Sequence, residues 1–201
     1  MMRAISGRPF RGATWLRIVA APALWACGGR QATTPETQPD PVAPRVLAIS
    51  RVFVLETSGP PPSDTSVTFT SGSPRLIVLY HAGESIAFAQ LTFEANAFGD
   101  SGQTVQVDVR PRPGIYGLDL TTSAPFRGGQ AAVTFVYGRY FSAPVRARQV
   151  FGSDVATERA LAVGRLLSES QVELLPSTRP ASDHLSAPIS APGSYIVAAP
   201  Q

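Results

Sequence analysis

The chain has 201 residues, 44% of them hydrophobic and 15% charged, which is enough for one domain with a core of ordinary size. Its 19 prolines and 17 glycines favour a loop-rich β protein over a helical bundle, because both residues interrupt helices and build turns. All 17 basic residues are arginine, and four of them precede Cys27, so that 13 remain beyond it against 14 acidic residues. No arginine cluster remains there to neutralise a phosphate backbone, and nucleic acid is therefore not expected as a partner.

The first 26 residues have the organisation of a signal peptide. Arg3, Arg8 and Arg11 form a charged opening, and residues 18–26 form an apolar run. A run of about nine residues suits the apolar centre of a signal peptide and is too short to cross a bilayer. We therefore predict that residues 1–26 direct export and are removed.

The apolar run ends in Leu24-Trp25-Ala26-Cys27, which resembles the lipobox of bacterial lipoproteins. The shared features are a leucine three residues before the cysteine, a small residue directly before it, and the cysteine as acceptor. Trp25 departs from the small or β-branched residue that is usual at its position. The resemblance implies cleavage after Ala26 and lipid on Cys27, where several acyl chains would hold the protein on a membrane.

Two other interpretations of this segment stay open. Residues 21–23 form an A-x-A-like cleavage site, which would give ordinary secretion, and Cys27 would otherwise be a plain buried thiol. Gly28 in place of an aspartate resembles the pattern that permits sorting to the outer membrane, so we expect an anchor at the outer membrane or the periplasmic face of the envelope. Residues 27–44 are rich in Pro and Thr, contain almost nothing to bury, and are predicted to be a tether.

From residue 45 onward, about ten short apolar segments alternate with turn residues. Residues 75–80 form a continuous apolar run that fits a strand buried on both faces, whereas residues 104–110 alternate valine with polar side chains. Residues 153–161 favour one or two helical turns, and no long amphipathic helix is evident. The pattern predicts one all-β domain over residues 45–201, an Ig-like antiparallel β-sandwich of about ten short strands. The segments are 45–56, 67–70, 75–80, 86–93, 104–110, 116–120, 133–137, 161–167, 171–175, 185–189 and 195–199.

The layout of residues 91–141 resembles the β-sandwich module of ankyrins and netrin receptors. The shared features are an aromatic strand, an Ala-Phe-Gly turn, a valine strand and then the strand at residues 133–137. The resemblance implies a sandwich that contacts other proteins.

Two serine motifs raise the possibility of catalysis. Ser85 lies in a near match to the G-x-S-x-G nucleophile elbow, and Asp183 and His184 follow it in Ser-Asp-His order. The elbow requires a strand-to-helix turn, whereas Ser85 precedes a predicted strand, so that a turn serine is favoured over a hydrolase. The second motif, His184-Leu185-Ser186, resembles the His-Leu-Ser/Thr site of self-cleaving adhesion-receptor domains.

That second resemblance implies that His184 helps the hydroxyl of Ser186 to attack the carbonyl of Leu185, with backbone strain driving an acyl shift. The flanking Trp and Cys residues of that family are absent here. The alternative is a histidine in the polar loop that begins the final hairpin.

Tyr137, Arg139 and Tyr140 place aromatic rings around a guanidinium, which would suit stacking on a sugar or a peptide. The competing interpretation, which strand alternation favours, buries Tyr137 in the core.

His81 and His184 are the only histidines, and the acidic residues do not cluster at ligand spacing, so neither a metal nor another cofactor is expected. We expect a lipid-anchored structural or protein-interaction module of the cell envelope, without enzymatic activity, that binds an envelope protein or glycan. The alternatives are a carbohydrate- or peptidoglycan-binding module and a hydrolase or self-cleaving domain.

Overall fold

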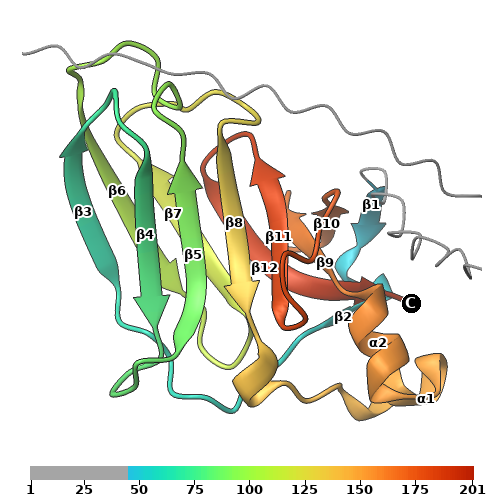
Figure 1. Cartoon of the computed structure of the whole chain (residues 1–201). Helices are drawn as coiled ribbons and strands as arrows, with labels where there is room; N and C mark the ends of the chain where they lie inside the picture. The colour runs from blue at the N-terminus through green and yellow to red at the C-terminus, as the bar shows by residue number, and fades with distance from the viewer. Residues whose placement is uncertain (1–44) are drawn as a thin grey trace, which may run out of the picture. The chain divides into compact units, whose positions relative to one another are not determined.

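The computed structural model describes residues 45–201. The predicted signal peptide, Cys27 and the tether lie outside the described residues. Twelve strands and two short helices make up the described chain (Figure 1). In chain order they are β1 (Arg45–Ala48), β2 (Val52–Val54), β3 (Thr65–Thr70), β4 (Arg75–Tyr80), β5 (Ala87–Phe93), β6 (Thr104–Pro111), β7 (Gly117–Thr122), β8 (Ala131–Val136), α1 (Val145–Phe151), α2 (Asp154–Ala160), β9 (Ala162–Leu166), β10 (Gln171–Leu174), β11 (His184–Ile189) and β12 (Gly193–Pro200).

The strands form two antiparallel sheets. The large sheet has eight strands in the order β1-β10-β9-β12-β7-β6-β3, with β2 paired to β12, and the small sheet has the order β11-β8-β5-β4. In the view of Figure 1 the small sheet lies in front of the large one. The prediction of an all-β domain with a sandwich-like architecture is confirmed at this level.

The main core lies between the two sheets. Val105, Val107 and Val109 of β6 are fully buried and confirm the predicted alternation of residues 104–110. Leu91 of β5 and Phe135 of β8 are also fully buried in this core, on the side of the small sheet. Each sheet therefore gives one face to the core, and the small sheet turns its other face outward.

The predicted strand at residues 45–56 is interrupted. A 3-10 turn, Ile49–Arg51, separates β1 from β2, and the backbone N–H of Ile49 donates to the carbonyl of Ser170 at 2.8 Å. The turn allows β1 to pair with β10 while β2 pairs with β12. One apolar run thus contributes to two different parts of the large sheet.

The two helices lie next to each other in the sequence. α2 falls inside residues 153–161, where one or two helical turns were expected, and the hydroxyl of Ser153 accepts the backbone N–H of Ala156 at its start. α1 was not expected. Its sequence signals are Pro144 directly before the first helical residue and Gly152 directly after the last, with φ of 82°.

The prediction that residues 75–80 are buried on both faces is wrong. Leu76 is 55% exposed and Tyr80 51%, whereas Ile77 and Leu79 between them are buried. The physical reason is that no other described layer covers the outward face of the small sheet, to which β4 belongs. A run of apolar residues does not by itself distinguish an edge strand from a central one.

Candidate functional site

The outward face of the small sheet combines eleven side chains from its four strands. Cross-strand register places Val78, Gln90, Thr134 and Ser186 in one row across the sheet. None of the eleven is acidic or an arginine. We call this set the outer sheet face: Leu76, Val78, Tyr80, Gln90, Thr92, Ala132, Thr134, Val136, His184, Ser186 and Pro188.

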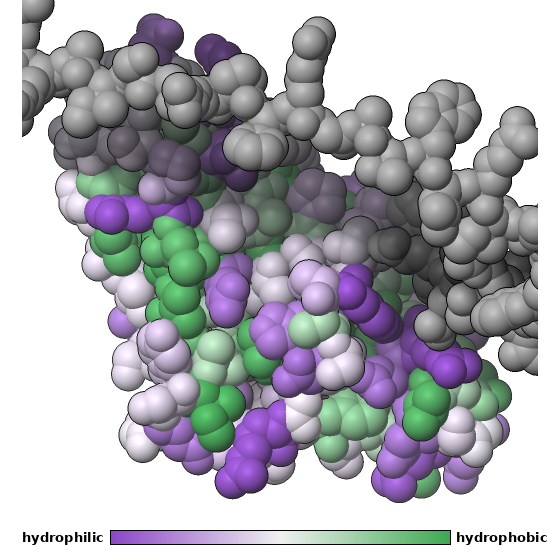
Figure 2. Space-filling view, viewed as in Figure 1, coloured by the Kyte–Doolittle hydropathy of each residue, from purple (hydrophilic) through white to green (hydrophobic). Residues whose placement is uncertain are grey.

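The apolar part of the outer sheet face lies on β4. Leu76, Val78 and Tyr80 follow one another along its outward side, while the strands β5 and β11 contribute mainly Gln, Thr, Ser and His. Figure 2 shows a hydrophobic strip along this left-hand part of the small sheet. No described strand pairs with the free side of β4.

The residues of the predicted self-cleavage site lie at the start and middle of β11. The Nδ1 atom of His184 lies 2.7 Å from the Oδ1 atom of Asp183, and the hydroxyl of Thr134 donates to the Oγ atom of Ser186 at 2.9 Å. The backbone N–H and carbonyl of Ser186 both bond to Thr178, at 2.9 and 2.8 Å. The Leu185–Ser186 bond is therefore held in a strand that is paired on both sides, and self-cleavage there stays a prediction.

Ser85 lies in the turn between β4 and β5, exposed to solvent. This turn joins two strands of a hairpin, whereas a nucleophile elbow joins a strand to a helix. Asp183 and His184 lie at the start of β11, and no hydrogen bond among the described residues links either of them to Ser85.

The three residues of the predicted ligand contact do not share one surface. Tyr137 is 1% exposed, and its hydroxyl donates to the Oε1 atom of Glu158 at 2.9 Å. Burial and this bond raise its pKa above the ordinary value for tyrosine. Arg139 is exposed, with its guanidinium 5.9 Å from the ring centre of Tyr140. Ligand binding by these residues stays a prediction, for which Arg139 and Tyr140 offer the accessible atoms.

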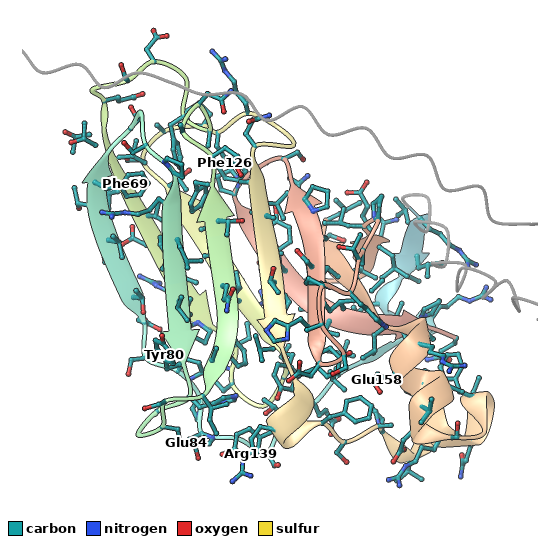
Figure 3. All side chains as sticks on the ribbon, in the orientation of Figure 1. Phe69, Tyr80, Glu84, Phe126, Arg139 and Glu158 are labelled. Carbon is teal, nitrogen blue, oxygen red and sulfur yellow. The ribbon has the colours of Figure 1, made fainter. Side chains whose placement is uncertain are left out.

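A buried polar cluster, which the sequence did not reveal, closes this end of the sandwich. His81 is 1% exposed, and its Nδ1–H donates to the carbonyl of Pro60 at 2.9 Å. Its ring packs edge-on against Tyr140, with ring centres 4.8 Å apart, and the Tyr140 hydroxyl donates to the Oε1 atom of Glu84. Figure 3 places Glu84 and Arg139 together at this end, opposite Phe69 and Phe126.

Two atoms of this cluster have no partner. The Nε2 atom of His81 and the Oε2 atom of Glu84 are buried without a hydrogen bond to any described residue. Because a carbonyl can only accept, Nδ1 of His81 carries a proton. Two buried atoms are too few for a metal site.

Two hollows in the described surface are open to solvent and lie away from these residues. One has a volume of about 340 Å³ and lies between residues 56–58 and the start of α1, where Glu56 and Arg148 supply the charges. None of the predicted site residues lines it. Within residues 45–201, no three His, Cys, Asp or Glu side chains come together as metal ligands.

None of the helices in the described part of the chain is long and apolar enough to cross a membrane. Comparisons with protein-family models, with curated proteins and with solved structures find no match. The physical features of the outer sheet face therefore carry the functional argument.

Proposed function

We propose that the protein is an exported, lipid-anchored sandwich of the Ig-like kind that works as a protein-interaction module of the cell envelope. Its contact surface is the outer sheet face, with the apolar side of β4 as the centre of binding. The observation that carries this proposal is the exposure of Leu76 and Tyr80, each more than half accessible on a face without acidic or arginine side chains.

The composition of this surface supports contact with protein. Interface centres are depleted in charged residues and enriched in tyrosine. The outer sheet face has no acidic or arginine side chain, and Tyr80 lies on its apolar strip. An exposed apolar edge strand is also a site of unwanted association, and proteins keep one where it has a use. Neither of the two best-formed hollows of the described surface is lined by residues of the outer sheet face, which suits a protein partner better than a small molecule.

The N-terminal segment supports the envelope location. Residues 1–26 have the pattern of a signal peptide, and Cys27 stands where the lipobox places its acceptor. Residues 27–44, rich in Pro and Thr, would serve as the tether between the lipid and the domain, at the outer membrane or the periplasmic face.

The interaction is tested in cells with a photo-crosslinking amino acid. Benzoylphenylalanine at Leu76 is expected to give a crosslinked species of discrete mass, whatever the partner. The matched control is the same residue at Thr68, an exposed position of β3 on the large sheet. No adduct at Leu76, or an equal adduct pattern at both positions, would refute the proposed contact surface.

The anchor is tested separately by cell fractionation. The full chain is expected in the membrane fraction at high salt, with a mass equal to residues 27–201 plus acyl groups. Cys27→Ser is expected to release it, since cysteine is the acyl acceptor. Equal membrane association of the Cys27→Ser chain would contradict a lipid anchor and leave the contact surface untouched.

A further inference from the structure

Five strands pair with another strand on one side only, and four of them are protected against further pairing; of these four, β2 has only three residues. Proteins protect such edges by short strands, polar or charged side chains, prolines or covering segments. β11 carries Pro188 and is bridged by Thr178, and β1 has four residues before the 3-10 turn begins. β3 turns the polar side chains of Ser66, Thr68 and Thr70 outward.

β4 has none of these protections. Its six residues contain no proline, and its only charged side chain, Arg75, stands at the start with its guanidinium 5.0 Å from the ring centre of Phe69 on β3. The bulge between β4 and β5 places the extra residue, Phe88, on β5. β4 therefore keeps a regular alternation, with Leu76, Val78 and Tyr80 outward.

The backbone of β4 is directed so that a further strand can pair with it. The backbone N–H of His81 donates to the carbonyl of Ile86 in the β4–β5 hairpin. Because backbone groups alternate in direction along a strand, the N–H and carbonyl groups of Leu76, Val78 and Tyr80 point to the free side. The same alternation, followed strand by strand across the sheet, predicts that the backbone N–H and carbonyl of Ser186 point away from β8. Both groups do so, because they bond to Thr178.

From this edge we propose that the partner is a second copy of the same chain, paired antiparallel through β4 with Val78 facing Val78 across a two-fold axis. This inference rests on the proposed function and names a partner for the β4 edge of the outer sheet face, where Leu76, Val78 and Tyr80 meet their counterparts edge to edge while the rest of the face stays open. In this register Leu76 faces Tyr80 of the second copy on the outward side, and Ile77 faces Leu79 on the core side. The three outward residues exchange backbone hydrogen bonds, and two four-stranded sheets become one.

The strand is complementary to itself in this register. An aliphatic side chain opposite an aromatic one is a favourable cross-strand pair, and no like charges meet in the middle of the interface. Because side chains alternate between the two faces of a strand, this register places outward residues opposite outward residues. The apolar strip therefore continues across the axis. A two-fold interface of this kind is closed and adds no further copies.

The test uses cysteine crosslinking in the full chain. Cys27→Ser removes the one natural thiol, and Val78→Cys places a new thiol next to the axis, where facing Cα atoms of a hydrogen-bonded pair are about 5.5 Å apart. A short bis-maleimide is expected to convert this variant to a covalent dimer. Thr92→Cys is the matched control, because strand spacing places the two Thr92 positions roughly 20 Å apart in the same dimer.

A second variant tests the same interface without a reagent. Val78→Arg places two like charges on the axis, and we expect the dimer measured by sedimentation to weaken at least roughly tenfold, while Thr68→Arg on β3 leaves it unchanged. Circular dichroism checks that both variants fold. Equal crosslinking of Val78→Cys and Thr92→Cys, a monomer at all concentrations, or a dimer that withstands Val78→Arg would overturn the second-copy proposal.

The outcomes separate this inference from the proposed function. A photo-adduct at Leu76 with twice the mass of the chain supports both. An adduct of any other mass, together with no crosslinking at Val78, overturns the second copy and leaves the interaction module standing. No adduct and no dimer refute both.

Discussion

Three buried tyrosines make the stability of this domain sensitive to alkali. Tyr116, Tyr137 and Tyr195 are at most 1% exposed, and burial raises the pKa of each above the ordinary value near 10. Below pH 10 all three are protonated in both the folded and the unfolded chain, and their full contribution to stability is present. Above pH 10 the unfolded chain loses these protons while the folded chain keeps them, so the free energy of unfolding falls as the pH rises.

The size of this effect follows from proton linkage. A tyrosine that ionises only in the unfolded chain lowers the free energy of unfolding by about 1.4 kcal/mol at one pH unit above its unfolded pKa. For Tyr137 this loss is about 1.4 kcal/mol at pH 11, and the raised pKa values of Tyr116 and Tyr195 add losses of the same sign. Domains of this size have total stabilities of roughly 5 to 15 kcal/mol, so a loss of this kind is large enough to measure by denaturant unfolding.

The assay is denaturant unfolding between pH 8 and pH 11, followed by far-ultraviolet circular dichroism. Both tryptophans, Trp15 and Trp25, lie in the predicted signal peptide, so that tryptophan fluorescence does not report on the sandwich. Tyr137→Phe loses the bond to Glu158 and is expected to cost about 1 to 2 kcal/mol at pH 8. It also removes one titrating group, so the further loss on going to pH 11 is expected to shrink by about 1.4 kcal/mol.

The matched control is Phe93→Leu. Phe93 is buried among Phe69, Phe98 and Phe126 and carries no titrating group, so its replacement lowers stability while keeping the full loss between pH 8 and pH 11. If Tyr137→Phe loses as much stability over this pH range as the unaltered chain, burial of the Tyr137 hydroxyl is not the source of the pH dependence.

Three further substitutions test packing and the Leu185–Ser186 bond. In Gly164→Ala the new Cβ would lie 2.6 Å from the Cγ2 atom of Val172, and a loss of about 1 to 3 kcal/mol is expected in thermal unfolding; an unchanged melting temperature would contradict this packing. In Gly59→Ala the Cβ would lie 2.5 Å from the ring of Tyr140, and a similar loss is expected, with near-ultraviolet dichroism reporting displacement of the ring. Self-cleavage requires a separate peptide of residues 186–201 in the denatured chain that is absent in Ser186→Ala; an intact mass in both chains would exclude it.

The alternation of apolar and polar residues predicted those strands that turn one face to the core and the other to solvent. The valines of residues 104–110 show this, since all three are fully buried in β6. It also favoured burial of Tyr137, which the structure confirms, although the bond from its hydroxyl to Glu158 depends on how α2 packs and has no local signal. The helix α1 did have a local signal, Pro144 before it and Gly152 after it, in a stretch whose valines resemble a strand.

The outer sheet face could not be predicted, because it depends on which strands become neighbours. Val78, Gln90, Thr134 and Ser186 are far apart in the sequence and meet only through the order β11-β8-β5-β4. The contacts of His81 with Pro60 and Tyr140 likewise depend on which segments the fold brings together. Short sequence motifs made Ser85 and His184 candidates. The fold places Ser85 in the turn between β4 and β5, and His184 at the start of β11.

The side chains of β4 that face outward are not needed to hold the strand in place. Ile77 and Leu79 are buried and attach β4 to the core, whereas Leu76 and Tyr80 leave more than half of their surface in water. Substitution at such exposed strand positions changes stability by only a few tenths of a kcal/mol, so the requirement to fold does not explain why they are apolar. β3, the neighbouring edge strand, has serine and threonine at its outward positions. The difference between the two edges is therefore best explained by contact, and replacing Leu76 and Tyr80 together by threonine should leave the unfolding free energy nearly unchanged while abolishing the crosslink at Val78→Cys.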